Sequence, residues 1–170
     1  MGLPLLPDPP APVVIVGPDR RRHSFVFRIW RAPTGISVEL RESRRDGRDG
    51  YEFAVLGAHD ADVDQLIDRV LEQAREEVAR CYLRRDRHVG GWTLGEADEV
   101  AGRISYDPDG GPPRVVVDGR ELTWDELGYL LSSYEGWRFR LTLHEQGDDL
   151  RPDARVVPLP SRARRPRRSP

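Results

Sequence analysis

Hydrophobic and polar residues alternate with a period of two along three stretches in the first third of the chain, residues 24–31, 36–40 and 51–56. This period predicts strands with one buried face. The Gly-containing turn Ala32–Gly35 joins the first two stretches and predicts a β-hairpin. The short apolar run Val13–Val16 adds a candidate edge strand beside them.

The period then changes to that of a helix between Asp62 and about Arg85. Asp62 is a suitable N-cap, with Gln65 three residues later. A continuous apolar stripe follows, which predicts one long helix with a buried face. Its members are Val63, Leu66, Ile67, Val70, Leu71, Ala74, Val78, Cys81 and Tyr82.

The second half of the chain predicts two strands, residues 100–106 and 114–117, and then a second helix. Asp118-Gly119 is a typical turn pair, because glycine accepts a positive φ without strain. Thr123 and Glu126 have the spacing of a capping box, which starts the helix. Gly136 is expected to end that helix.

A last alternating stretch predicts a strand with one buried face. Its apolar residues Trp137, Phe139, Leu141 and Leu143 alternate with polar ones. The predicted order is therefore βββαββαβ. Because consecutive strands are not separated by crossover helices, we expect an α+β two-layer sandwich with an antiparallel or mixed sheet of about six strands and both helices on one face.

Four segments of the chain resemble a widespread uncharacterised bacterial domain family. Its signature is DGRE(L/I)(T/S)WDE(L/F)G followed by (Y/F)EGW, and residues 117–128 and 134–141 match it. Residues 50–57 and 100–107 are also similar, so the resemblance spans residues 48–146. It implies a domain of unknown function and names no reaction. Some relatives carry a Cys-rich, zinc-finger-like segment upstream, which this chain lacks.

Composition and charge divide the chain into a body and two ends. Residues 1–19 are rich in proline and predict a disordered arm, residues 20–147 a single α+β domain, and residues 148–170 a disordered Arg/Pro-rich tail. All 27 basic residues are arginine; residues 151–170 hold seven against one acid, and residues 1–150 hold 20 against 28. The body is therefore acidic and the tail basic.

The sequence offers little that is typical of a catalytic or cofactor site. The four histidines and one cysteine have no metal-ligand spacing, and no glycine pattern fits a phosphate loop. Cys81 on the apolar stripe is expected to be a buried core residue. We therefore expect no cofactor and no metal. The N-terminus is interrupted by prolines, so we expect no signal peptide, and the lack of a long apolar run predicts no membrane span. We therefore expect a cytoplasmic protein.

Candidate functional residues cluster around the tryptophans and the end of the second predicted helix. Trp30, Trp92 and Trp124 exceed what one core needs and suggest an interaction surface. Glu135 lies where the helix dipole disfavours negative charge, so it calls for an ion pair with Arg103, Arg120 or Arg138. Gly136, Trp137 and Arg138 belong to the same group of candidates.

Three functions follow from these features. The leading hypothesis is a non-enzymatic module that binds a protein partner or a second copy of itself. The second is a nucleic-acid accessory protein whose tail arginines contact phosphates, without aromatic residues for base stacking; these are Arg162, Arg164, Arg165, Arg167 and Arg168. The third is an enzyme with a site around Glu135, Arg138 and Trp124.

Overall fold

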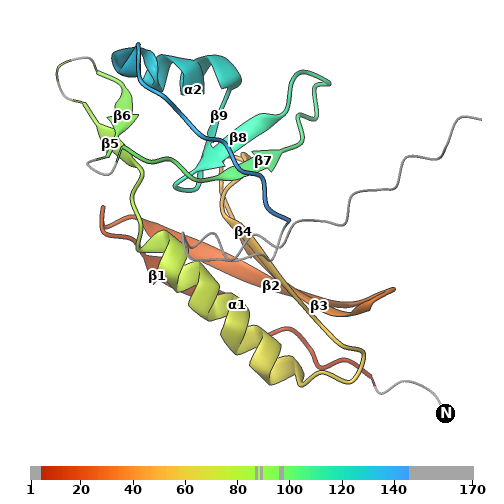
Figure 1. Ribbon diagram of the computed structural model, residues 1–170. Coiled ribbons are helices and arrows are strands. Elements are labelled where there is room, and N and C mark those ends of the chain that lie inside the picture. Colours follow the sequence, from red (N-terminus) through yellow and green to blue (C-terminus); the bar gives the residue numbers. More distant parts are fainter. Residues whose placement is uncertain (1–4, 87, 89, 96–97, 146–170) are drawn as a thin grey trace, which may run out of the picture.

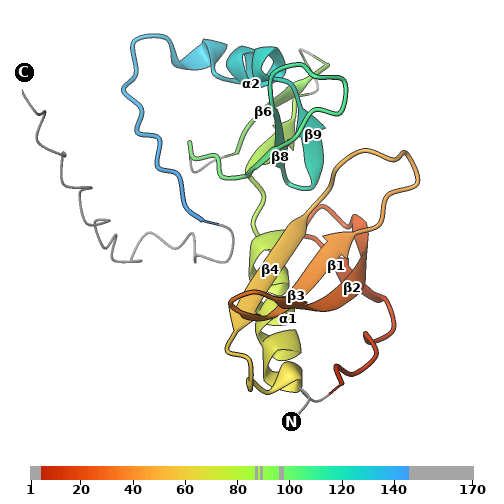
Figure 2. The same ribbon diagram turned by 90° about the vertical axis from the view of Figure 1, so that its right-hand side faces the viewer.

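The computed structural model describes residues 5–86, 88, 90–95 and 98–145. Within these residues the protein is mostly β, with nine strands in three sheets, two α-helices and one short 3₁₀ helix. The predicted two-layer sandwich and its βββαββαβ order are therefore wrong. The elements form two successive halves, each with its own hydrophobic core, which lie one above the other in Figures 1 and 2.

The first half is an antiparallel four-stranded sheet covered on one face by a helix (Figure 1). Strands β1 (Val13–Val16), β2 (Arg22–Ala32), β3 (Gly35–Glu42) and β4 (Glu52–Gly57) pair in chain order, and the sheet is curled. Helix α1 (Val63–Val78) packs on β3 and β4. The predicted hairpin, the third strand and the candidate edge strand are confirmed.

The first core forms where the apolar face of the sheet, which has a two-residue period, packs against the apolar face of α1, which has a helical period. Alternate residues of the strands point towards α1, and its buried residues follow at helical spacing. The fully or nearly fully buried side chains include Phe25, Phe27, Val38, Leu40 and Phe53 from the sheet and Leu66, Val70, Ala74 and Val78 from the helix.

Helix α1 ends seven residues earlier than predicted, at Val78. The next segment leaves the helix to form a hairpin of β5 (Leu83–Arg85) with β6 (Trp92–Leu94). A side chain from the second half stabilises this exit, because the Asp118 carboxylate accepts hydrogen bonds from the backbone N–H groups of Tyr82 and Leu83, at 3.2 and 2.7 Å.

Cys81 lies in this exit segment and is exposed, so its predicted place in the core is wrong. Its Sγ contacts the Leu83 carbonyl oxygen at 3.2 Å. Partial burial and the charge of Asp118 raise the pKa of the thiol, which keeps it protonated and weakly nucleophilic at neutral pH.

The second half is built on a three-stranded antiparallel sheet. Strands β7 (Arg103–Ser105), β8 (Arg114–Val117) and β9 (Arg120–Leu122) pair in chain order, and helix α2 (Trp124–Leu130) follows. Its core joins side chains of this sheet to the β5–β6 hairpin and to α2. The core residues are Tyr82, Leu83, Leu94, Val115, Val117, Leu122 and Leu130.

The predicted start of the second helix is confirmed in detail. Thr123 Oγ1 accepts the N–H of Glu126 at 3.1 Å, and the Glu126 carboxylate accepts the N–H of Thr123 at 2.7 Å. The helix ends earlier than predicted, at Leu130, and a 3₁₀ turn (Ser132–Tyr134) continues the chain. Gly136 takes the expected positive φ, +84°, directly after that turn.

The strand predicted at Trp137–Leu143 does not form within the described part of the chain. The segment has no regular secondary structure, pairs with none of the three sheets, and leaves its apolar side chains exposed. The exposed fractions are 65% for Trp137, 91% for Phe139, 71% for Leu141 and 70% for Leu143. The alternation is real, but the second core closes without this segment. No helix among the described residues is both long and apolar enough to span a bilayer.

Candidate functional site

The turn between β8 and β9 joins the two halves of the molecule. Asp118 and Gly119 both have positive φ, +49° and +63°, as a two-residue hairpin turn requires. Arg21 Nη1 donates to the Asp118 carbonyl at 3.2 Å, and Arg44 Nη1 donates to the Gly119 carbonyl. The arginines come from the first half, so the Asp-Gly turn predicted from sequence is also the docking point of the second half.

A buried polar cluster in the first half supports this docking point. The Glu42 carboxylate contacts His23 Nδ1 at 2.8 Å and accepts the Tyr51 N–H at 3.0 Å. His23 is 3% exposed, and the ring of Tyr51 packs edge-on against it with centroids 5.2 Å apart. Burial raises the pKa of the Tyr51 hydroxyl well above its ordinary range. Tyr51 therefore stays neutral and presents a rigid ring to the turn.

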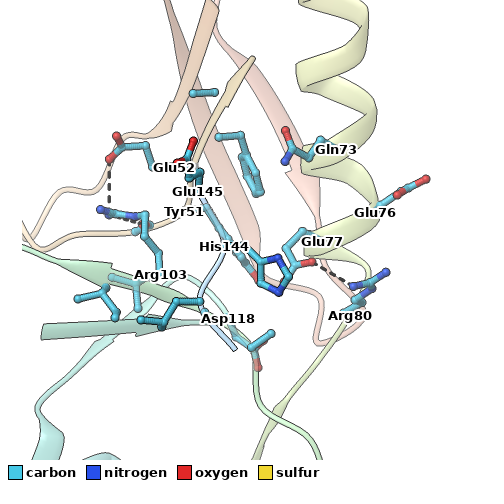
Figure 3. Close-up of a pocket in the computed structure, with 18 of the residues that line it drawn as sticks. Tyr51, Glu52, Gln73, Glu76, Glu77, Arg80, Arg103, Asp118, His144 and Glu145 are labelled. Carbon is cyan, nitrogen blue, oxygen red and sulfur yellow. Dashed lines mark hydrogen bonds and ion pairs between the residues drawn. The ribbon is translucent and has the colours of Figure 1, made fainter. Parts of the chain in front are cut away.

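A cleft of about 490 Å³ lies between the two halves, beside this docking point (Figure 3). One wall comes from residues 50–54 and the C-terminal end of α1, and the other from residues 101–104 with Val116 and Asp118. Residues 142–145 line the same cleft, where the segment after Trp137 descends from α2 towards the first half (Figures 1 and 2). The cleft is therefore assembled from three separate parts of the chain.

Acidic side chains outnumber arginines in the cleft lining. The five acids are Glu52, Glu76, Glu77, Asp118 and Glu145, against Arg80 and Arg103. Arg103 Nη2 lies 3.5 Å from Glu52 and 3.6 Å from Asp49. Glu77 has a similar contact, at 3.5 Å to Arg80 (Figure 3).

Burial leaves two of these carboxylates poorly solvated. It raises the pKa of Glu77, and Arg80 offsets the effect only in part. Burial also raises the pKa of Asp118, although two backbone N–H groups stabilise its negative charge and lower that pKa. Both groups therefore carry their negative charge at some cost to the fold.

Replacement of Glu77 by glutamine is expected to stabilise the protein at pH 7 by about 1 kcal/mol, because burial penalises the charged carboxylate more than the neutral amide. The carboxyl pKa is higher in the folded protein than its ordinary value of 4.5, so the unfolded chain loses this proton first as pH rises. The charge therefore lowers stability above that value, and the gain from Glu77→Gln should disappear below about pH 4. Urea unfolding between pH 4 and 8 measures it.

The matched control for this experiment is Glu72→Gln, on the exposed face of the same helix. It should change the free energy of unfolding by less than about 0.5 kcal/mol at either pH. A loss of stability in Glu77→Gln at pH 7 would show that the Arg80 contact outweighs the cost of burial.

The structure separates the tryptophans that the sequence grouped as candidates. Trp30 is half-buried on β2 beneath the Arg28 guanidinium, 5.6 Å from the ring centroid. Trp92 packs against the second core, with Arg120 only 3.9 Å above its ring. Trp124 is 42% exposed at the start of α2. Trp30 therefore lies in the first half, whereas Trp92 and Trp124 lie on β6 and α2 of the second half, two elements that contact each other.

Glu135 and its neighbours lie outside the cleft lining. Glu135 and Arg138 are exposed, and Trp137 packs edge-on against Tyr134 with centroids 5.3 Å apart. Two of the partners proposed for Glu135 are engaged elsewhere, because Arg103 faces Glu52 and Arg120 stacks on Trp92. The cleft therefore gives no support to the enzyme hypothesis for this group, because these residues do not line it.

The predicted phosphate contacts at Arg162, Arg164, Arg165, Arg167 and Arg168 lie outside the described residues, as does the tail from residue 148. Within the described part of the chain, no group of three or more His, Cys, Asp or Glu side chains is placed to hold a metal ion. Sequence reasoning missed Glu42, His23 and the cleft carboxylates. A glutamate inside the apolar alternation of β3 was the one available signal.

Two family models match the chain, and each describes a domain of unknown function. Residues 7–79 match DUF7686, and residues 82–148 match DUF7713. The resemblance to a family of unknown function is thereby confirmed at this level, with two models where the sequence suggested one. The matches divide the chain between α1 and β5, where the two cores also separate. The single domain over residues 20–147 stays a prediction.

Neither a search of curated proteins nor a search of solved structures found a match.

Proposed function

We propose that the protein is a non-enzymatic interaction module that associates with a second copy of itself through the segment Trp137–Leu143. The observation that supports this is the exposure of four large apolar side chains on a segment whose apolar and polar residues alternate and which pairs with none of the three sheets. A segment of this kind has a strong preference for pairing, because a sheet edge would satisfy its backbone groups and cover its apolar face.

The edge of β4 is suited to receive the segment. β4 is an end strand of its sheet, and no strand of the described residues pairs with its outer side. Along β4, Phe53 and Val55 face the α1 side while Glu52 faces the opposite side. A strand added there with its apolar residues towards α1 would place Arg138 and Arg140 on the face of Glu52. One register of pairing therefore satisfies both the apolar alternation and the approach of opposite charges.

Light scattering coupled to size-exclusion chromatography tests the proposal on the full chain. We expect a mass of twice 19.4 kDa that persists at high salt, because the contact is mainly apolar. Leu141→Asp should give a monomer. The matched control is Leu5→Asp, at a leucine that is 98% exposed in the N-terminal segment, and it should leave the dimer intact. A monomer of the unmodified chain at all concentrations would refute the proposal.

The cytoplasmic location and bacterial source expected from the sequence are part of this proposal. Tail binding to nucleic acid remains a prediction on residues outside the described part.

A further inference from the structure

Beyond the β4 edge that the proposed self-association uses, the cleft between the two halves has charged and polar groups from α1 and from the second half. It is hollow and acidic, and its lining includes Tyr51, whose ring stacks on that of the buried Phe53 with centroids 5.7 Å apart. The buried Oε1 of Gln73, on the same lining, has no hydrogen-bond partner among the described residues. A group that carries positive charge, N–H donors and a flat surface would complement all three features, and guanidinium has each of them.

The chain supplies such groups within a short sequence distance of the cleft. Glu145, the last described residue, is part of the lining, and Arg151 follows it by six residues, a reach of about 20 Å when extended. Residues 151–170 hold seven arginines against one acid. The basic segment is therefore tethered at the mouth of the acidic cleft, where its local concentration is of the order of millimolar.

We propose that the cleft is a binding site for an arginine-rich peptide segment, and that the chain's own residues 151–170 occupy it. The contact would place guanidinium groups against Glu76 and Glu77 at the end of α1 and beside the ring of Tyr51. This inference does not rest on the proposed self-association, but the two share residues, because the β4 edge proposed to receive the segment Trp137–Leu143 includes Glu52 and Phe53 of the cleft lining.

The cost of the cleft carboxylates to the fold supports this assignment. Glu77 lies in a partly buried position where its charge is poorly compensated, at 18% side-chain exposure. Groups that lower stability are commonly retained at sites that bind something. A bound guanidinium would supply the compensation that Arg80, at 3.5 Å, gives only in part.

A labelled peptide competing with the tail of the full chain tests the proposal. The probe is a fluorescein-labelled peptide with the sequence of residues 151–170, and fluorescence anisotropy measures its binding. One partner is the unmodified chain. The other is a full-length chain without the tail arginines, called here the tail-neutral chain, which carries R151S, R155S, R162S, R164S, R165S, R167S and R168S.

The peptide should bind the tail-neutral chain and bind the unmodified chain at least about tenfold more weakly, because the tethered tail competes. Binding should weaken steeply with added salt. Adding E76Q and E77Q to the tail-neutral chain should reduce affinity at least about tenfold. The matched control adds D68N and E72Q, which remove the same charge from the exposed face of the same helix, and should change affinity less than about twofold.

Three results would overturn the proposal. Equal binding to the unmodified and tail-neutral chains would show that the tail does not occupy the site. Equal loss in the E76Q/E77Q and D68N/E72Q variants would show that the peptide binds acidic surface in general. Absence of binding to the tail-neutral chain would remove the site. Urea unfolding confirms that each variant is folded, and light scattering of the unmodified chain reports on self-association separately.

Discussion

Replacement of Glu42 by alanine is expected to destabilise the fold by about 2–5 kcal/mol. The carboxylate contacts His23 Nδ1 at 2.8 Å and accepts the Tyr51 N–H at 3.0 Å, so alanine leaves two polar groups without their partner. The side chains of His23 and Glu42 are only 3% and 5% exposed, so water cannot easily replace the lost contacts. Urea unfolding at pH 7 measures the change.

Glu42→Gln provides the graded comparison for this variant. The amide keeps one carbonyl acceptor in nearly the same volume, so it should lose about half as much free energy as Glu42→Ala. An exposed glutamate changed in the same way, Glu72→Ala, should stay within about 0.5 kcal/mol of the unmodified chain. A loss below about 1 kcal/mol in Glu42→Ala would contradict the role given to this cluster.

Gly119→Ala is expected to cost about 2–4 kcal/mol. Gly119 has φ of +63°, which an L side chain rarely adopts, and an added Cβ would lie 2.8 Å from Tyr51 Cδ2 and 2.8 Å from Glu42 Oε2. The ring of Tyr51 is held by the buried cluster and cannot move aside freely. The first half would therefore have to separate from the turn or shift its core. Thermal and urea unfolding measure the loss.

Gly110→Ala is the matched control for the backbone contribution. Gly110 has φ of +77° and nothing within 4 Å of an added Cβ, so alanine there should cost only about 1–2 kcal/mol. The difference between the two variants isolates the contact between the halves. Equal losses at the two positions would mean that the turn is not pressed against Tyr51 in solution.

Much of the secondary structure could be predicted because it is determined by residues that are close together in the sequence. The two-residue period of residues 24–31 and 36–40 and the capping box of Thr123 depend only on near neighbours, and both were confirmed. Strands β5, β6 and β9 have three residues each, too few to show a period, and were missed. Helix α1 was extended too far because Cys81 and Tyr82 continue its apolar pattern, although Cys81 is exposed and Tyr82 belongs to the second core.

The arrangement of sheets and helices could not be predicted, because an apolar face in the sequence does not indicate which other element covers it. The alternation of Trp137 to Leu143 indicated burial, yet the second core closes without it. The cleft could not be predicted for the same reason, because its lining residues are far apart in the sequence and come together only in the folded structure. Glu77 and Asp118 lie in different halves of the sequence and meet across one cleft.

The docking of the Asp118–Gly119 turn also bears on the order of folding. The hairpins of the first sheet join residues close in sequence, whereas the Arg21 contact with Asp118 spans 97 residues. Closing so long a loop costs entropy, which a formed Tyr51–Glu42–His23 surface helps to offset. The first half should therefore be assembled before the second half attaches, and attachment of the turn should be the last slow event on the folding pathway.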